Sequence, residues 1–474
     1  MIKHNIEKLK TILLIFLIIT SFIQIGIHWN QQNQGFPFRF IAQIFNVSDN
    51  SRAMDVESLK LKYFVPESII VSRSLTASKW RLGPDDSFFQ DIWNDMTNNY
   101  LPSILRQKPN KVLPESQWSV ITSTNCINIE FPLNWPNEII YWFENIKPGE
   151  VRGFGSLKSI AIVPGEDVNK TINTLYVYDG SQVYQYMVNI KEDFLPKDFY
   201  AALPDILEDQ DEPVLYSLPF ESSKDILVHD SVGDTDSYHT LYISIPQSIT
   251  LDIENIESEA LQESILLNQK DSFMVKYNES VSEILFTDTE NLYKLYKNSI
   301  LEYKYLPESN KRQAGSVSAS FAQAISFIEL RRGLLGNIDL ILTDIKEAGN
   351  YYEMFFDYSY RGTPVYCVGL NGRIMPSITI KANEDRVLEC KWVIRSFEEN
   401  DKPKNYSLYF SRLMNELIPA TYPEILTPDD GIIYFERIEP AYFFNLNSGN
   451  RTAVPNWAIS SKTRDYFIPL AEEG

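Results

Sequence analysis

The feature that most constrains this chain is a run without charged residues, Thr11 to Ile27, directly after a short basic head. At a helical rise of about 1.5 Å per residue the run spans about 26 Å, the short end of what crosses the hydrocarbon core of a bilayer. Trp29 follows where an interfacial aromatic anchor belongs. The sequence therefore predicts a transmembrane helix over residues 11–28.

The charges around this helix predict its orientation. Lys3, Lys8 and Lys10 precede it, and no Lys or Arg follows until Arg39. Because positive residues are retained on the cytoplasmic side, we expect residues 1–10 in the cytoplasm and the rest of the chain outside. The protein is then a single-pass protein of the cell membrane with an extracytoplasmic bulk.

A cleaved signal peptide also begins with a basic region and an apolar core. After the apolar run this chain continues Gly-Ile-His-Trp-Asn-Gln-Gln from Gly26, which places bulky residues where a small-x-small cleavage site belongs. The sequence therefore favours an uncleaved anchor.

Three polar residues of the anchor recur at a spacing of four. Thr20, Gln24 and His28 lie on one face of a helix. Amide and hydroxyl groups within a membrane can hydrogen-bond to another helix, so this stripe is a hypothetical contact with a transmembrane partner. The alternative is that His28, and also Gln24, lie among the lipid headgroups.

The net charge of the chain is −20, from 63 Asp and Glu against 43 Lys and Arg. Nucleic acid is bound mainly through Lys and Arg, so it is not expected as a partner. Basic proteins and divalent cations remain open, as does a surface that charge merely keeps dispersed. With 44% apolar and 13% aromatic residues, the part beyond the anchor is rich enough to form a globular ectodomain of two to four domains.

The cysteines are few and odd in number: Cys126, Cys367 and Cys390. Their spacing matches neither a disulfide scaffold nor a zinc knuckle. Cys367 and Cys390 lie in strand-like segments, where they are either buried thiols or one cross-strand pair. An outer face with so few disulfides suits a Gram-positive bacterium.

Periodicity and turn signals predict an α+β fold with antiparallel sheets and packed helices. Helices are expected over residues 86–105, 135–145, 257–268, 318–332 and 406–417. Strands are expected over 61–71, 118–131, 159–163, 174–178, 183–190, 241–245, 273–277, 283–286, 340–345, 351–360, 374–382, 386–397, 432–438, 442–446 and 456–459. Five tryptophans at helix or strand spacing are expected in the core: Trp93, Trp135, Trp142, Trp392 and Trp457.

Composition shifts divide the chain beyond the anchor. A Gln-rich and Asn-rich stretch predicts a juxtamembrane linker over residues 29–57, and an acidic, Pro-containing stretch between 191 and 219 predicts a junction. We therefore expect a linker and three α+β domains, over residues 29–57, 58–192, 193–314 and 315–474.

The usual catalytic motifs do not occur in the sequence. It has no HExxH, GxSxG, GxxxxGK[ST], SxxK or CxxC. The sequence therefore predicts that the protein is not an enzyme and that it uses no cofactor.

One segment, residues 229–239, concentrates groups that can ligate a metal. His229, Asp234, Asp236 and His239 offer imidazole and carboxylate ligands of the kind that zinc or calcium uses. Their spacing matches neither a helical HxxxH motif nor an EF-hand loop. The alternative to a metal site is a solvated turn before the strand at 241.

Several segments resemble the YycH family, which comprises membrane-anchored regulators of Gram-positive two-component signalling. The resemblance lies in the Lys-headed anchor, in scattered short matches and in the general layout. The matching segments are Thr11–Ser21, Phe64–Ile70, Phe88–Trp93, Gly362–Tyr366 and Val454–Trp457.

The resemblance implies a three-domain extracytoplasmic α+β protein. It also implies that the protein works with a companion single-pass regulator to set the activity of a sensor histidine kinase that controls cell-wall metabolism, partly through transmembrane-helix contacts. The expected function is therefore regulation of that kinase. The alternatives are an anchored binding module for a wall fragment or peptide, or an anchored metal-dependent hydrolase that uses the segment from His229 to His239.

Overall fold

The structure is a computed structural model that describes residues 56–472 except 75–77, 85, 147–152, 166–171, 190–194, 196–198, 211–214, 218–226, 230–234, 251–258, 268–272, 279–282, 308–312, 337, 400–403, 427–432, 448, 450 and 462–463. The expected head, anchor and most of the linker, with Thr20, Gln24 and His28, lie outside this part. Among the helices that the structure describes, none is both long and apolar enough to cross a membrane.

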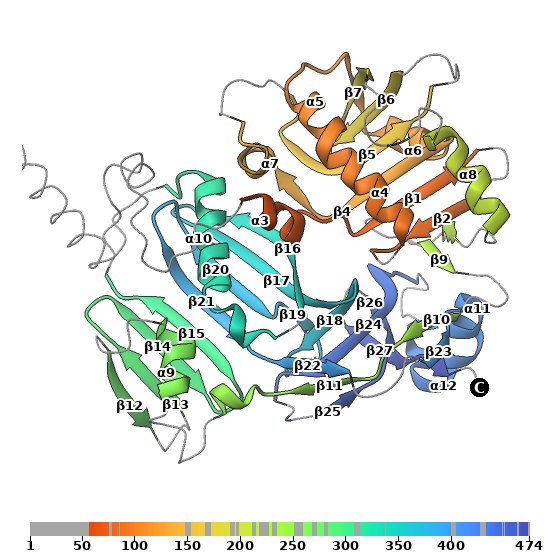
Figure 1. The fold of residues 1–474 in the computed structure, drawn as a ribbon. Coiled ribbons are helices and arrows are strands. Elements are labelled where there is room, and N and C mark those ends of the chain that lie inside the picture. The colour runs from red at the N-terminus through yellow and green to blue at the C-terminus, as the bar shows by residue number, and fades with distance from the viewer. Residues whose placement is uncertain are drawn as a thin grey trace, which may run out of the picture. The chain divides into compact units, whose positions relative to one another are not determined.

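The predicted α+β class with antiparallel sheets is confirmed (Figure 1). Within the described residues, seven strands form one sheet in the order β2-β1-β4-β5-β6-β7-β3, and all neighbouring pairs are antiparallel. These strands are β1 (Ser68–Arg73), β2 (Ser78–Leu82), β3 (Lys111–Pro114), β4 (Cys126–Pro136), β5 (Ser156–Val163), β6 (Ile172–Tyr178) and β7 (Gln182–Asn189).

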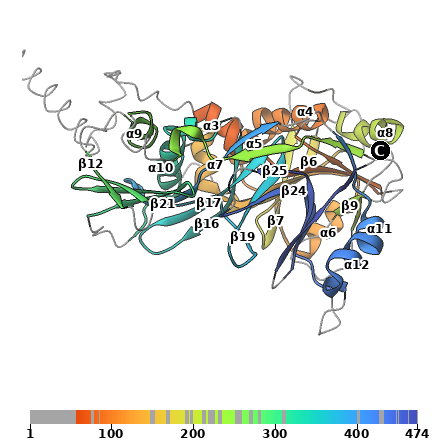
Figure 2. The same cartoon turned by 90° about the horizontal axis from the view of Figure 1, so that it is seen from below.

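Helices cover both faces of this sheet. In Figure 2, α4 and α6 lie on opposite sides of it. Ile121 of α6 packs with Ala161 and Val183 of the sheet. The helices of this part are α3 (Val56–Tyr63), α4 (Ser87–Asp95), a π-helical turn (Met96–Tyr100), α5 (Leu101–Leu105), α6 (Ser116–Thr122), α7 (Asn137–Phe143) and α8 (Phe199–Gln210).

The predicted helix over residues 86–105 is confirmed as α4, the π turn and α5. Asp86 is its N-cap, and its side chain accepts a hydrogen bond of 2.8 Å from the amide of Phe88. Phe89, Ile92 and Trp93 are buried on one face, as their spacing predicts.

Two predicted strands begin with residues that belong to a helix. Residues 61–63 end helix α3, because Leu59 and Tyr63, four residues apart, bury one helical face while Leu61 is exposed. Residues 118–122 belong to α6, where Ile121 is buried and Trp118 is half-buried at a helical spacing of three.

A second sheet contains thirteen of the described strands. Its order is β12-β13-β14-β15-β21-β20-β17-β18-β24-β26-β27, with β16 paired to β17 and β19 to β18. Only β18 and β24 pair in parallel among them. The strands are β12 (Met274–Asn278), β13 (Glu283–Thr287), β14 (Asn291–Tyr296), β15 (Ile300–Tyr305), β16 (Asp339–Glu347), β17 (Tyr352–Tyr360), β18 (Thr363–Val368), β19 (Ile374–Met375), β20 (Ile378–Ala382), β21 (Val387–Val393), β24 (Arg437–Asn445), β26 (Asn456–Ser460) and β27 (Asp465–Pro469).

Helix α10 (Val317–Glu329) lies against β17, β20 and β21, and α9 (Glu259–Leu266) lies near β13 to β15 (Figure 1). Ser316 is the N-cap of α10 and accepts from the amide of Ala319. The predicted helix over 406–417 begins later, because residues 404–407 form β23. It consists of α11 (Phe410–Arg412), a π turn (Leu413–Leu417) and α12 (Ile418–Thr421).

Smaller antiparallel sheets complete the described fold. One has the order β10-β23-β28, another β22-β11-β25, and β8 pairs with β9. The strands are β8 (Leu215–Ser217), β9 (Leu227–His229), β10 (Thr235–Tyr238), β11 (Leu241–Ser244), β22 (Ser396–Glu399), β23 (Lys404–Ser407), β25 (Arg451–Ala453) and β28 (Ala471–Glu472). Short 3-10 helices are Gln247–Ile249, Arg332–Leu334 and Pro423–Leu426.

Aromatic side chains join α10 to the seven-stranded part. The fully buried ring of Phe321 lies 5.8 to 6.1 Å from the rings of Trp135, Trp142 and Phe143. Of the five tryptophans expected in the core, Trp142 is half-buried and the others are buried. The predicted three-domain division stays a prediction; strands on both sides of residue 314 belong to the thirteen-stranded sheet.

Candidate functional site

The predicted metal ligands fall at separate places in the described fold. His229 ends β9, where its backbone is paired with Leu215, and Asp236 lies in β10 opposite Tyr406. Asp234 is outside the described residues. In the part of the chain that the structure describes, no three His, Cys, Asp or Glu residues are grouped to hold a metal ion. A metal site at the four residues stays a prediction.

His239 lies at a junction of sheets. It follows β10, which belongs to one three-stranded sheet, and comes two residues before β11, which belongs to the other. Tyr442 of β24, in the thirteen-stranded sheet, donates a hydrogen bond of 2.6 Å to the His239 carbonyl oxygen. The connector between two small sheets is thereby fixed to the large one.

The β17–β18 turn brings a guanidinium to this connector. Tyr360 pairs with Thr363, so Arg361 and Gly362 form a two-residue hairpin loop. Both have positive φ, 47° and 77°, as a type I′ turn requires. Gly, Asn and Asp adopt this conformation readily, whereas an arginine there is strained by about 1 kcal/mol.

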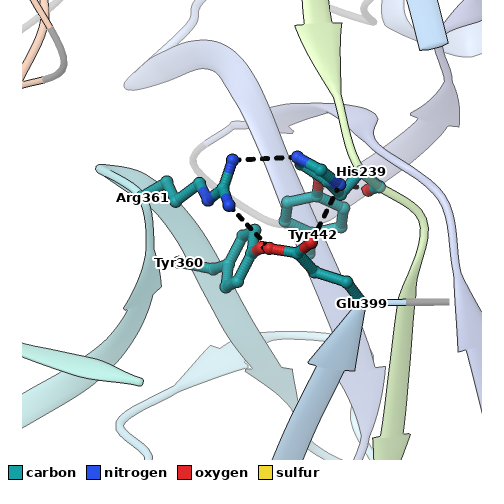
Figure 3. A network of polar contacts seen from close by, with 5 residues as sticks. All are labelled: His239, Tyr360, Arg361, Glu399 and Tyr442. Carbon is teal, nitrogen blue, oxygen red and sulfur yellow. Dashed lines mark hydrogen bonds and ion pairs between the residues drawn. The ribbon is translucent and has the colours of Figure 1, made fainter. Parts of the chain in front are cut away.

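The side chains of this junction form a connected polar network (Figure 3). One nitrogen of Arg361, Nη1, lies 2.9 Å from His239 Nε2, and the other, Nη2, donates to Glu399 Oε1 at 2.7 Å. His239 Nδ1 lies 3.4 Å from Glu399 Oε2, and the Tyr360 hydroxyl donates to Glu399 Oε1. We call His239, Tyr360, Arg361, Glu399 and Tyr442 the His239 junction.

The hydrogen-bonding groups determine the state of the histidine. A guanidinium has only donors, so His239 Nε2 must accept from Arg361. The ring is then neutral and carries its proton on Nδ1, the nitrogen that faces Glu399.

The carboxyl group of Glu399 and the hydroxyl group of Tyr360 shift each other's pKa. The hydrogen bond from Tyr360 is the main cause that lowers the pKa of Glu399, and the charge of Arg361 adds to it. Burial, followed by the hydrogen bond to Glu399, raises the pKa of Tyr360 to about 12. At neutral pH Glu399 is therefore ionised beside Arg361, and the Tyr360 hydroxyl keeps its proton.

This arrangement suits a structural contact better than catalysis. The Nε2 lone pair of His239, which a general base or a metal ligand uses, is engaged by Arg361. The opposite charges of Arg361 and Glu399 compensate each other, and both side chains are about half exposed, 54% and 41%.

The turn also contacts the seven-stranded part of the fold. A Cβ placed on Gly362 would lie only 2.8 Å from Cγ of Pro84, in the loop before α4. The His239 junction and the loop at Pro84 are thus linked through two consecutive turn residues.

Sequence reasoning singled out His239 but missed Tyr360, Arg361, Glu399 and Tyr442. Arg361 and Tyr442, for example, lie 122 and 203 residues after His239 in the sequence. One signal was present: Arg before Gly in a two-residue hairpin, where Asn or Asp is usual.

The cysteines offer no reactive group near this site. Cys126, Cys367 and Cys390 are free and buried. Burial raises the pKa of each thiol to about 12, so at neutral pH they are protonated and unreactive.

The fold has a counterpart among solved structures. No protein-family model matches the sequence. No curated protein matches it either. The chain is similar to the crystal structure of YycH from Bacillus subtilis, with a TM-score of 0.54 over 87% of this chain and 97% of that chain, at 12% sequence identity. The resemblance is thus confirmed for the fold.

Proposed function

We propose, with the YycH-like fold of this chain as the premise, that the protein is a membrane-anchored regulator of a sensor histidine kinase that controls cell-wall metabolism. It acts without catalysis, from the outer face of a Gram-positive cell membrane, and together with a companion single-pass regulator. The fold similarity over 87% of the chain is the observation that carries this proposal. The charge-free run Thr11 to Ile27 supports the anchor.

The proposed mechanism is a shift between two states of the kinase. A bound helix favours one state only by its difference in affinity for the two, and about 1.4 kcal/mol changes their ratio tenfold. Interhelical hydrogen bonds in membranes contribute about 0.6–2 kcal/mol each. Two or three such bonds from the stripe, formed with one state of the kinase and not with the other, supply a difference of this size.

The test is a transcriptional reporter of the kinase pathway in cells that carry a variant anchor. Thr20→Leu with Gln24→Leu removes the polar groups but keeps an apolar helix, so we expect normal membrane insertion and a severalfold change in reporter output. The matched control is Ile18→Leu with Phe22→Leu, on the opposite face of the predicted helix. It should leave the output unchanged.

An equal output from the wild type and the polar-face variant would contradict the role of the stripe. Replacement of residues 11–28 by an unrelated anchor then tests whether regulation needs the native sequence of the helix. Full activity with the foreign helix would transfer the function to the ectodomain, as expected for a binding module.

A further inference from the structure

Asp357 is a buried carboxylate with few partners. It lies in the middle of β17, and the residue is 9% exposed. Its Oδ1 accepts a hydrogen bond of 3.1 Å from the amide of Ser377. Among the described residues, this is the single hydrogen bond of the Asp357 carboxylate. No Lys, Arg or His among them lies within ion-pair distance of it.

A carboxylate offers about four acceptor positions. An ionised group that leaves most of these empty inside a protein is strongly disfavoured, and it relieves the penalty by binding a proton. Ser377 strengthens this argument, because its hydroxyl oxygen Oγ is buried and has no hydrogen-bond partner among the described residues. A proton on Asp357 supplies a donor beside a residue that has an unused acceptor.

The cation whose charge acts on Asp357, Arg437 of β24, is already engaged by other groups. Its Nε lies 3.2 Å from Glu439, and its guanidinium lies over the ring of Tyr366 at 4.9 Å. The Tyr366 hydroxyl donates to Glu439 at 2.5 Å. The field of Glu67 also acts on Arg437.

Arg437 is therefore the charged group that acts on Asp357, and part of its charge is compensated by Glu439. Arg437 attracts its ionised form, whereas Tyr366 and the thiol of Cys367 on the neighbouring strand are neutral. Burial, opposed by the Ser377 amide and by Arg437, raises the pKa of Asp357 from 3.8 to about 6.

We propose that Asp357 is a proton-binding site built into the thirteen-stranded sheet, through which mild acid outside the cell stabilises the packing of β17 against the Ser377 segment. The site is occupied by a proton below about pH 6 and is empty above it. The stability of the sheet then depends on the pH of its surroundings.

The direction follows from proton linkage. Between about pH 4 and pH 6 the folded state holds a proton at Asp357 that the unfolded chain has released. Stability contributed by this group is therefore present at low pH and is lost as pH rises through about 6. A difference of about two pKa units corresponds to about a hundredfold change in the folding equilibrium constant.

The test compares urea unfolding of the full chain, purified in detergent, at pH 4.5 and pH 7.5. Asp357→Asn keeps the acceptor for Ser377 and removes the charge. Relative to wild type, we expect its folding constant to rise by about a hundredfold at pH 7.5 and by less than about tenfold at pH 4.5. Asp344→Asn in β16, whose carboxylate is 47% exposed, is the matched control and should show no such difference.

The same ratio of Asp357→Asn to wild type at both pH values would overturn the proposal. Infrared spectroscopy of the wild type provides a second measurement that does not depend on the variant folding. The carbonyl band of a buried, protonated carboxyl group should be present at pH 4.5 and disappear between pH 5 and pH 7. A spectrum without that band at pH 4.5 would equally overturn the assignment.

Discussion

Lys60 of α3 and Glu144 at the end of α7 form an ion pair of 2.7 Å in which the side chains are only 5% and 8% exposed. Glu144 is the C-cap residue of α7, and Asn145 follows with a positive φ of 50°. The Lys60 ammonium thus lies at the negative end of the α7 dipole. Lys62, two residues further along α3, pairs at 2.6 Å with Glu329, the last residue of α10.

Lys60→Met should destabilise the protein by about 3–5 kcal/mol at pH 7, because it leaves the carboxylate of Glu144 buried without its cation. Burial already raises the pKa of Glu144, and Lys60 opposes that shift. The variant should therefore lose less stability at pH 4, where the folded state protonates Glu144. Urea unfolding of both proteins at the two pH values measures this.

The control for this prediction is Glu57→Gln. Glu57 lies 3.8 Å from the same ammonium but is 60% exposed, so its loss should cost less than about 0.5 kcal/mol. Equal effects of the Lys60 and Glu57 variants would show that burial does not strengthen the inner pair.

Gly362→Ala should destabilise the protein by about 1–3 kcal/mol more than Gly372→Ala. Both glycines have positive φ, 77° and 74°, but only Gly362 would place a Cβ against Pro84. The backbone strain of an alanine with positive φ is therefore the same in both variants. The difference between their free energies of unfolding measures the contact between the β17–β18 turn and the seven-stranded part. Thermal or urea unfolding of the two variants gives this value.

Pro84→Ala provides the check, because it removes Cγ and Cδ, the two atoms nearest to the new methyl group. Combined with Gly362→Ala, it should recover most of the additional loss as a coupling energy above about 1 kcal/mol. Strict additivity of the two substitutions would mean that the turn and the loop do not touch.

His239 should be neutral, with its proton on Nδ1, at pH 8. Nitrogen NMR of histidine-labelled protein distinguishes the tautomers, and the chain has only four histidines to assign. Arg361→Met removes the donor to Nε2, so the ring should then populate both tautomers. A wild-type spectrum with the proton on Nε2 would contradict the contact between His239 and Arg361.

Local patterns predicted the elements that are held together locally. The helix from Asp86 onward combines a capping side chain with apolar residues at helical spacing, and both signals lie within a few residues of each other. The run of tyrosine and phenylalanine from residue 351 to 360 likewise predicted the central strand β17.

The elements that were predicted wrongly owe their secondary structure to tertiary contacts. Helix α3 has only eight residues, too few to be stable alone, and its side chains are held by Glu144 and Glu329. The contact between Lys62 and Glu329 joins residues 267 positions apart. A local pattern carries no information about such a pair.

The candidate site was predictable only in part for the same reason. Local composition drew attention to His239, but its partners, Arg361 and Glu399, come from two other sheet segments. Arg361 has a positive φ, so the fold keeps its contacts with His239 and Glu399 at the expense of backbone strain.

The most direct test of the regulatory role is photo-crosslinking within the membrane from position 24, followed by mass spectrometry of the captured protein. We expect a histidine kinase, or a second single-pass protein bound to it, and a much lower yield from position 18 on the opposite face. Capture of lipid alone from both positions, in cells where the kinase is present, would contradict regulation through the anchor.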